Sequence, residues 1–329
     1  MTRLLIFEPA YQRVAAALEP LKDRIELAIV HADGRITCEG ETLDTDTAQP
    51  DWGWMSADSA FGAGARNLFV AMLKSNRLSW VHTGAAGVDN PVWGQLVARG
   101  AVLTTGHGQA ISIADYVLGE VLGHDQRLPE RRAEQAARRW TRLPFREIAG
   151  TTWLIVGFGA IGQGVAERAR GFGAEIVGVR RSDGVHPLAS RMGKLEDVRA
   201  LLPEADVVVL STPLNDATRD IADAGFFAAM KPKSVLANVG RGGLVDEAAL
   251  LAALDAGVPE FAVLDVFQTE PLPEASPFWA HPKVALNPHA SAFGSGQIAR
   301  NDALFLENLR RRLAGEPLLH EADPRDLGK

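Results

Sequence analysis

Cysteine is nearly absent from this sequence, since Cys38 is the only one in 329 residues. A single cysteine can form neither an intrachain disulfide nor a cluster of thiolate metal ligands. Long apolar runs are missing too: no stretch approaches the roughly 18 uninterrupted apolar residues of a membrane-spanning helix. The first apolar run, residues 4–7, stops at Glu8 and is too short for the core of a signal peptide. We therefore expect no membrane association and a cytoplasmic location.

An excess of basic residues is also absent. The chain has 34 Lys and Arg against 41 Asp and Glu, a net charge of −7, which disfavours binding to nucleic acid or to an anionic membrane. The hydrophobic fraction of 47% and the charged fraction of 23% are ordinary for a globular chain and exclude a disordered or collagen-like protein. The length is roughly twice that of a typical domain, so two domains are expected.

Short apolar runs alternate with helical patterns along the whole chain. Most of the runs are rich in Val, Ile and Leu and lack polar alternation, which is typical of parallel strands covered by helices on both faces. This alternation predicts doubly wound α/β layers. The expected strands are residues 4–7, 25–30, 78–82, 102–104, 152–156, 175–179, 206–210, 234–238, 261–266 and 283–286, with helices such as 162–171, 195–202 and 246–256.

Two further helical segments are expected. Residues 110–128 predict a long helix with a mostly apolar first half, followed by a basic stretch, 131–142, that contains Trp140. This region is either a connecting helix with a solvated end or a dimer interface. Near the C-terminus, Leu306, Leu309 and Leu313 fall on one helical face and predict a packed amphipathic helix, with a loose tail from Pro324 onward.

Residues 157–162 read GFGAIG and follow an apolar strand at the start of a helical pattern. Gly157, Gly159 and Gly162 match G-x-G-x-x-G, with Ala160 and Ile161 inside the motif. The first glycine allows a tight turn, the second lets the backbone approach a pyrophosphate, and the third lets helix and strand pack closely. Glycine triplets also occur in purely structural turns, but the strand before and the helix after favour a dinucleotide site at the helix N-terminus.

The strand 175–179 is followed by Arg180, Arg181 and Ser182. An NAD site places Asp or Glu about 20 residues past the first glycine, where it accepts from the ribose 2′-hydroxyl. Guanidinium groups and a hydroxyl instead bind a 2′-phosphate through charge-assisted hydrogen bonds. This predicts NADP as cofactor, with NAD left open because Asp183 lies close by. The alternative is a solvated basic turn.

Three segments further along carry polar residues that core packing does not require. Residues 238–250 (NVGRGGLVDEAAL) contain Arg241, residues 264–273 (LDVFQTEPLP) contain Asp265 and Glu270, and residues 287–291 (NPHAS) contain His289. All follow the C-terminal ends of expected strands, where open α/β sheets bind ligands.

Singly, these residues could be a surface arginine, a loop carboxylate and a structural histidine. Together, Arg241, Glu270 and His289 suit the reduction of a 2-oxo acid. The arginine fork holds the substrate carboxylate, and the imidazolium protonates the carbonyl oxygen as hydride arrives. The glutamate orients the imidazole and favours its charged form.

The order and spacing of these segments, together with residues 264–279, resemble the D-isomer-specific 2-hydroxyacid dehydrogenase family over nearly the whole chain. The resemblance implies that Arg241, Glu270 and His289 are the catalytic trio, with Arg241 and His289 also binding substrate. It implies that Asp265 contacts the nicotinamide side of the cofactor. Thr212 and Pro213 would belong to the loop beside the cofactor.

The resemblance further implies a Rossmann-type doubly wound cofactor domain, residues 105–290. A smaller, flavodoxin-like α/β substrate domain, residues 1–104 and 291–329, would be discontinuous. In VHTGAAGVDN, the N–H groups of Ala86 and Gly87 would meet the carboxylate of a small 2-oxo or 2-hydroxy acid. A homodimer is expected from the family and from the apolar helix of residues 110–122.

The chain departs from the family at residues 104–116 (TTGHGQAISIADY), where Asp115 replaces the usual glutamate. His107 and Gln109 in this stretch are candidates for contact with cofactor or substrate. Residues 276–282 (SPFWAHP), with Trp279, resemble the glyoxylate and hydroxypyruvate reductase branch, so NADPH-dependent reduction to the D-2-hydroxy acid is expected.

Three other functions are weighed against this one. A phosphoglycerate-type NAD-dependent dehydrogenase often carries a regulatory domain, which is not expected because the chain stops soon after its closing helix. Formate dehydrogenases pair their histidine with glutamine, whereas this chain has Glu270. A nicotinamide-sensing corepressor would bind proteins without needing the catalytic trio.

Overall fold

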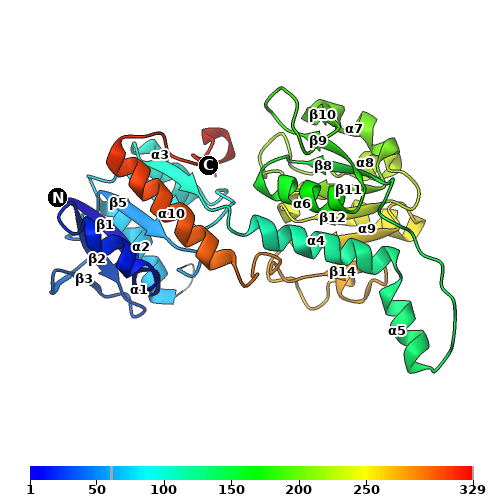
Figure 1. The fold of residues 1–329 in the computed structure, drawn as a ribbon, viewed down its shortest axis with the longest axis horizontal. Coiled ribbons are helices and arrows are strands. Elements are labelled where there is room, and N and C mark those ends of the chain that lie inside the picture. Colours follow the sequence, from blue (N-terminus) through cyan, green and yellow to red (C-terminus); the bar gives the residue numbers. More distant parts are fainter. Residues whose placement is uncertain (60–61, 328–329) are drawn as a thin grey trace. The chain divides into compact units, whose positions relative to one another are not determined.

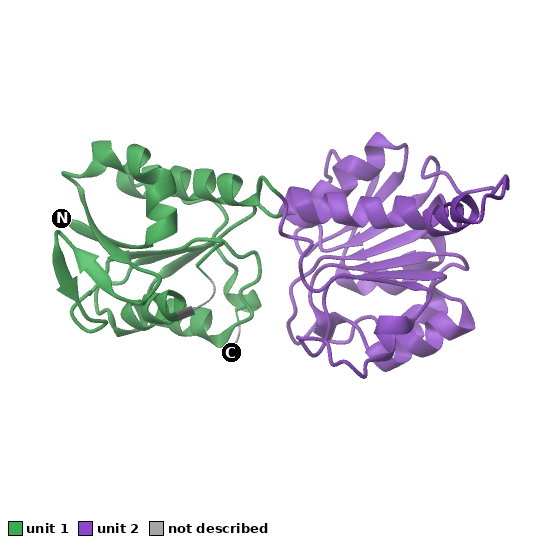
Figure 2. Ribbon diagram, turned by 90° about the horizontal axis from the view of Figure 1, so that it is seen from below, with its two compact units in different colours: residues 1–109, 295–329 green, residues 110–294 purple. Residues whose placement is uncertain are grey.

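The computed structural model describes residues 1–59 and 62–327 of the chain. The chain divides into two compact units, Met1–Gln109 with Ser295–Lys329 (unit 1) and Ala110–Gly294 (unit 2). Figure 2 shows a sheet in each unit with helices on both of its faces. The roles expected for residues 1–104 with 291–329 and for 105–290 stay predictions. No helix in the described part of the chain is both long and apolar enough to cross a membrane.

The sheet of unit 1 has the strand order β4-β3-β2-β1-β5-β6-β7. From β2 to β7 its strands are parallel in the order 2-1-3-4-5 of flavodoxin-like folds, and β3 and β4 add an antiparallel hairpin at one edge. The smaller flavodoxin-like fold is therefore confirmed. Its elements are β1 Thr2–Phe7, α1 Glu8–Leu18, β2 Ile25–Val30, β3 Ile36–Cys38, β4 Glu41–Leu43, β5 Trp52–Met55, α2 Gly62–Lys74, β6 Trp80–Thr83, α3 Pro91–Ala98, β7 Val102–Thr105 and α10 Gln297–Ala314 (Figure 1).

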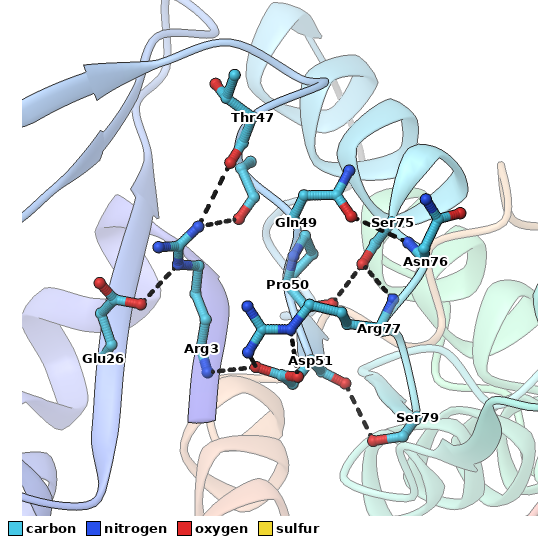
Figure 3. Close-up of polar contacts among 11 residues, drawn as sticks. Arg3, Glu26, Thr47, Gln49, Pro50, Asp51, Ser75, Asn76, Arg77 and Ser79 are labelled. Atoms are coloured by element: carbon cyan, nitrogen blue, oxygen red, sulfur yellow. Dashed lines mark hydrogen bonds and ion pairs between the residues drawn. The ribbon is translucent and has the colours of Figure 1, made fainter. Parts of the chain in front are cut away.

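Ion pairs and hydrogen bonds join the strands of unit 1 at the N-terminal ends of β1, β5 and β6 (Figure 3). The Asp51 carboxylate accepts the backbone N–H of Arg3 at 2.8 Å and two guanidinium bonds from Arg77 at 3.0 and 2.8 Å. The Arg3 side chain in turn donates to Glu26 at 2.7 Å and to the carbonyl of Ala48 at 2.6 Å. Because ligands of such sheets bind at the opposite, C-terminal ends of the strands, this network is structural.

The sheet of unit 2 has the order β10-β9-β8-β11-β12-β13-β14, and its paired strands are parallel. This is the 3-2-1-4-5-6 order of a Rossmann fold, extended by one strand, so that expectation is confirmed as well. The elements are α4 Ala110–Asp125, α5 Leu128–Ala136, β8 Thr152–Val156, α6 Ala160–Gly171, β9 Glu175–Val179, β10 Arg191–Gly193, α7 Val198–Leu201, β11 Val207–Leu210, α8 Ala224–Ala229, β12 Val235–Asn238, α9 Glu247–Ala256, β13 Phe261–Leu264 and β14 Val284–Leu286.

The expectation of one continuous helix over residues 110–128 is wrong. Helix α4 ends at Asp125, and Arg127 takes a left-handed conformation with φ of 57° before α5 begins with a proline in its first turn. Figure 1 shows α5 projecting from the rest of unit 2. Arg146 ties the end of the loop that follows α5 back to α4, since its guanidinium donates to the buried Asp125 carboxylate at 2.6 Å.

Residues 324–327 are more ordered than expected. Residues Pro324–Asp326 form a short 3₁₀ helix capped by the Asp323 side chain, and Leu327 packs against the core of unit 1. Just before it, the backbone pairs with β7: Thr105 N–H donates to the His320 carbonyl at 3.0 Å and Ala322 N–H to Leu103 at 2.8 Å. The amphipathic helix is confirmed as α10, in which Leu309 is fully buried.

Candidate active site

The glycine-rich turn connects β8 to α6 in unit 2. Gly157 has a left-handed φ of 101°, and a Cβ there would collide with the backbone of Ser211 and Thr212. A Cβ at Gly162 would collide with the Gly157 carbonyl oxygen. At Gly159, by contrast, a Cβ would have nothing within 4 Å, so the turn is open to an approaching ligand there.

Helix α6 begins at this open point. Gly159 is its N-cap, with extended backbone and no side chain to accept the first N–H groups of the helix, which include those of Ala160 and Ile161. Unpaired N–H groups and the helix dipole together favour an anion at such a position. The turn therefore fits the pyrophosphate of a dinucleotide.

The end of β11 lies beside the glycine turn. The Ser211 hydroxyl donates to the Gly157 carbonyl at 2.9 Å, and Thr212 and Pro213 follow directly. Strands β8 and β11 are neighbours at the point where the strand order reverses, and open α/β sheets bind ligands at that point. The structure thus brings Thr212 and Pro213 to the edge of the sheet where a cofactor is expected.

The basic residues after β9 form a turn closed by a side chain. The Arg180 guanidinium donates to the carbonyl oxygens of Ser182 and Asp183, at 3.2 and 3.4 Å. Arg181 and Ser182 are exposed. The Asp183 carboxylate is paired with Lys194, whose Nζ lies 2.9 Å away. Sequence reasoning missed Lys194, because it follows a three-residue strand, Arg191–Gly193, that has no apolar run to indicate it.

Arg241 sits in a turn between β12 and α9 that is held by Asn238 at the end of the strand. The Asn238 amide donates to the Arg241 carbonyl at 3.0 Å and accepts the Gly240 N–H at 3.2 Å. A Cβ at Gly242 would overlap the Phe267 carbonyl group, so the turn packs directly on the chain that follows β13. The guanidinium of Arg241 donates to the Gly240 carbonyl at 2.8 Å.

Glu270 and His289 are brought together from the loops that follow β13 and β14. Glu270 Oε1 accepts the Phe267 N–H at 2.9 Å, and Oε2 lies 2.7 Å from Nδ1 of His289. The histidine side chain is 48% exposed and the glutamate 33%. The carboxylate thus engages one ring nitrogen, and Nε2 is the nitrogen that can reach a reacting group.

Asp265 is 2% exposed and its carboxylate is surrounded by donors from the segment 287–291. Oδ1 accepts from the Asn287 amide at 2.6 Å and from the N–H groups of Ala290 and Ser291 at 3.0 Å, while Oδ2 accepts the Ser291 hydroxyl. His289 itself has a left-handed φ of 52°, and its N–H donates to the Asp265 carbonyl at 2.8 Å. Asp265 therefore shapes the histidine loop; the contact with the nicotinamide stays a prediction.

Asn287 and Ser291 were not singled out from the sequence. Their polar side chains flank His289 within NPHAS, and that placement was the only signal available. In the structure both donate to Asp265 and so act as positioning residues for the histidine.

The unit 1 residues expected at the site lie in two loops. Ala86 is exposed and Gly87 half-buried in the loop after β6, which the buried Val88 anchors. His107 packs on His320 with ring centroids 3.7 Å apart and the rings tilted by 40°. Gln109 is buried and donates to the Gly106 carbonyl at 3.1 Å. The structure thus gives His107 and Gln109 partners within unit 1. Burial, with the nearby His320, lowers the pKa of His107 to about 4.

Comparison with known proteins shows which family the chain belongs to. The family model described as "D-isomer specific 2-hydroxyacid dehydrogenase, NAD binding domain" matches residues 118–291. The chain belongs to this family. Glyoxylate/hydroxypyruvate reductase B of Klebsiella pneumoniae (strain 342) is 35% identical over 270 residues, which cover 79% of this chain and 82% of that protein.

The family also includes larger relatives. The D-3-phosphoglycerate dehydrogenase of Mycobacterium tuberculosis (strain ATCC 25618 / H37Rv) is 34% identical over 302 residues, covering 90% of this chain and 52% of that protein. The chain therefore spans about half the length of the phosphoglycerate dehydrogenases that it matches.

Among solved structures, a D-isomer specific 2-hydroxyacid dehydrogenase from Xanthobacter autotrophicus Py2, in complex with NADPH and MES, superimposes with a TM-score of 0.77. It is 29% identical, and the match covers 99% of each chain. The matched family is one of dehydrogenases, and the matched region is its NAD-binding domain, so the protein belongs to an oxidoreductase family.

Proposed function

We propose that the protein reduces a small 2-oxo acid to the D-2-hydroxy acid with NADPH. The observation that carries the proposal is the pair of His289 and Glu270, 2.7 Å apart, placed with Arg241 at the C-terminal ends of β12 to β14 in the family's NAD-binding domain. NADPH, when bound, would supply the hydride that adds to the carbonyl carbon, and the oxidised cofactor would leave as NADP⁺.

The protein side of the reaction falls to three side chains. Arg241 holds the substrate carboxylate with its planar fork, which fixes the carbonyl carbon in place. His289 donates the proton from Nε2 to the carbonyl oxygen, so that the hydroxyl forms as the hydride arrives. Glu270 accepts the bond from Nδ1–H and stabilises the positive charge that the imidazole carries before it gives up the proton.

The preference for NADPH is supported by the residues after β9. Arg180 and Arg181 stand where an NAD site places a carboxylate, and the nearby Asp183 is already paired with a lysine. The structure of the relative from Xanthobacter autotrophicus Py2 contains NADPH, which supports this preference.

Glyoxylate and hydroxypyruvate are the proposed substrates, in line with the similarity to glyoxylate/hydroxypyruvate reductase B. The second candidate is phosphoglycerate-type, NAD-dependent oxidation, favoured by the 34% identity to a D-3-phosphoglycerate dehydrogenase. Initial rates with NADPH and NADH against glyoxylate, hydroxypyruvate and 3-phosphohydroxypyruvate separate the two. Fast NADPH-dependent turnover of the first two, with hydroxypyruvate converted to the D-product, supports the proposal. Turnover of the phosphorylated acid with NADH alone overturns it.

We further propose that residues 1–104 with 291–329 act as the substrate domain, in which Ala86 and Gly87 offer N–H groups to the carboxylate. We also propose that the protein is a cytoplasmic homodimer. The arm formed by α5 and the loop after it supports a dimer. Trp140 in this arm is 97% exposed, and Phe145 is 52% exposed beneath the Arg131 guanidinium. The mass in solution tests this: a dimer for the wild type and a weaker one for Trp140→Ala is expected, and a monomeric wild type contradicts it.

A further inference from the structure

The lysine after β10 lies beside the arginine after β9. Strands β9 and β10 are parallel, with Gly193 opposite Val179, and the Arg180 N–H donates to the Gly193 carbonyl at 3.2 Å. Lys194 and Arg180 therefore leave neighbouring strand ends at the same edge of the sheet. Strand ends of this kind form the ligand-binding edge of an open α/β sheet.

Lys194 is held by the turn that carries the arginines. The turn runs through Asp183 to Gly184, which has a left-handed φ of 109°, and the Arg180 side chain closes it from inside. The Asp183 carboxylate, 83% exposed, pairs with Lys194 Nζ, 47% exposed, at 2.9 Å. An exposed pair of this kind is weak, so a stronger anion can take the lysine from it.

Three carboxylates also lie around Lys194, those of Asp183, Glu196 and Asp197. The hydrogen bond from the ammonium group to Asp183 raises the pKa of the lysine most, and the charges of Asp183, Glu196 and Asp197 raise it further. The Asp197 carboxylate also accepts the backbone N–H of Lys194 at 2.8 Å. Without Lys194, the charge of these carboxylates would be opposed at the strand ends by Arg180 and Arg181.

We propose that Lys194 is a third cation of the site for the ribose 2′-phosphate, and that Asp183 holds it only while no phosphate is bound. The proposal rests on the proposed use of NADPH. A phosphate monoester carries close to two negative charges and three acceptor oxygens, so it outcompetes the single Asp183 carboxylate for the ammonium group. A ribose 2′-hydroxyl carries no charge and leaves the Asp183–Lys194 pair in place. Lys194 thus favours the phosphorylated cofactor, and Asp183 opposes it.

The dissociation constants of NADPH and NADH, measured by fluorescence titration for the full chain, test this assignment. Lys194→Gln is expected to raise the Kd of NADPH about fivefold relative to that of NADH, the effect of one exposed charge. Asp183→Asn is expected to lower the Kd of NADPH about twofold or more relative to that of NADH, because the lysine loses its competing partner. Arg191→Gln is the matched control, since Arg191 lies in the same strand and pairs with Glu204 at 2.6 Å; its ratio should equal that of the wild type.

The outcomes separate this assignment from the cofactor preference itself. If the wild type prefers NADPH and Lys194→Gln keeps the full preference, or changes it no more than Arg191→Gln does, the role of Lys194 is overturned and NADPH use stands. If the wild type binds NADH as tightly as NADPH, the proposed cofactor preference fails, and the role of Lys194 fails with it.

Discussion

Replacing Glu270 with glutamine removes one negative charge and keeps the shape of the side chain. In the native protein Oε1 accepts the Phe267 N–H at 2.9 Å and Oε2 contacts His289 Nδ1 at 2.7 Å. An amide can serve only one of these donors. If its oxygen keeps the Phe267 bond, its NH₂ group faces Nδ1 and forces that nitrogen to accept. If the amide flips, its NH₂ group meets the Phe267 N–H and the two donors oppose each other.

The magnitude follows from the bond that is lost. A hydrogen bond to a charged group contributes about 1.5–3 kcal/mol, and each 1.36 kcal/mol is a factor of ten, so kcat for reduction should fall about 10- to 150-fold. The Kd of NADPH should stay the same, and KM for the 2-oxo acid should change little, because Arg241 holds the carboxylate. The assay is NADPH oxidation at saturating cofactor over a range of substrate concentrations.

The matched control is Glu274→Gln, which neutralises an exposed carboxylate in the same loop. It should leave kcat unchanged. A Glu270→Gln enzyme with the kcat of the wild type would refute the reasoning, since the charge opposite Nδ1 would then have no part in proton transfer. A loss confined to KM would also refute it.

Three other predictions concern substrate, cofactor and stability. Arg241→Ala removes both guanidinium bonds to the carboxylate and should lower kcat/KM about 10²- to 10⁴-fold, mainly through KM; a kcat/KM within threefold of the wild-type value contradicts the role. Arg180→Asp should swing the ratio of kcat/KM values for the two cofactors towards NADH, and an unchanged ratio means that the phosphate is held elsewhere. Burial lowers the pKa of His82 to about 3 and that of His107 to about 4, so the unfolded chain binds protons that the folded chain rejects. The contribution of these two histidines to the free energy of unfolding should therefore be constant above about pH 7 and fall below about pH 6, by up to about 1.4 kcal/mol per pH unit for each histidine. Urea titrations at several pH values across this range should show that the free energy of unfolding of His107→Phe falls less steeply with decreasing pH than that of the wild type. An equal dependence on pH contradicts the assignment.

The sequence was sufficient to predict most of the strands of both sheets, because their Val- and Leu-rich runs are buried on both faces. Strand β5 was missed since it reads Trp-Gly-Trp-Met. The hairpin of β3 and β4 was missed because each strand has only three residues. The helix breaks at Arg127 because this single residue has a left-handed backbone conformation, which the spacing of apolar residues along the sequence does not predict.

At the site, sequence reasoning supplied the residue types but not their bonds. The positions of Glu270 and His289 after strands predicted that they share an edge of the sheet, yet only coordinates give the 2.7 Å contact. The resemblance placed Asp265 beside the cofactor, whereas the bonds of its carboxylate in the structure run to the loop of His289. Lys194 could not be inferred because its pairing with the Asp183 turn depends on the register of a three-residue strand.

The central claim is that His289 gives the proton when a 2-oxo acid is reduced by NADPH. The most direct test is the rate of NADPH oxidation with hydroxypyruvate for the wild type and for His289→Gln, with the Kd of NADPH measured for both. The account predicts a kcat lower by about 10²- to 10⁴-fold in the variant, with cofactor binding intact. A His289→Gln enzyme that turns over at the wild-type rate would contradict it.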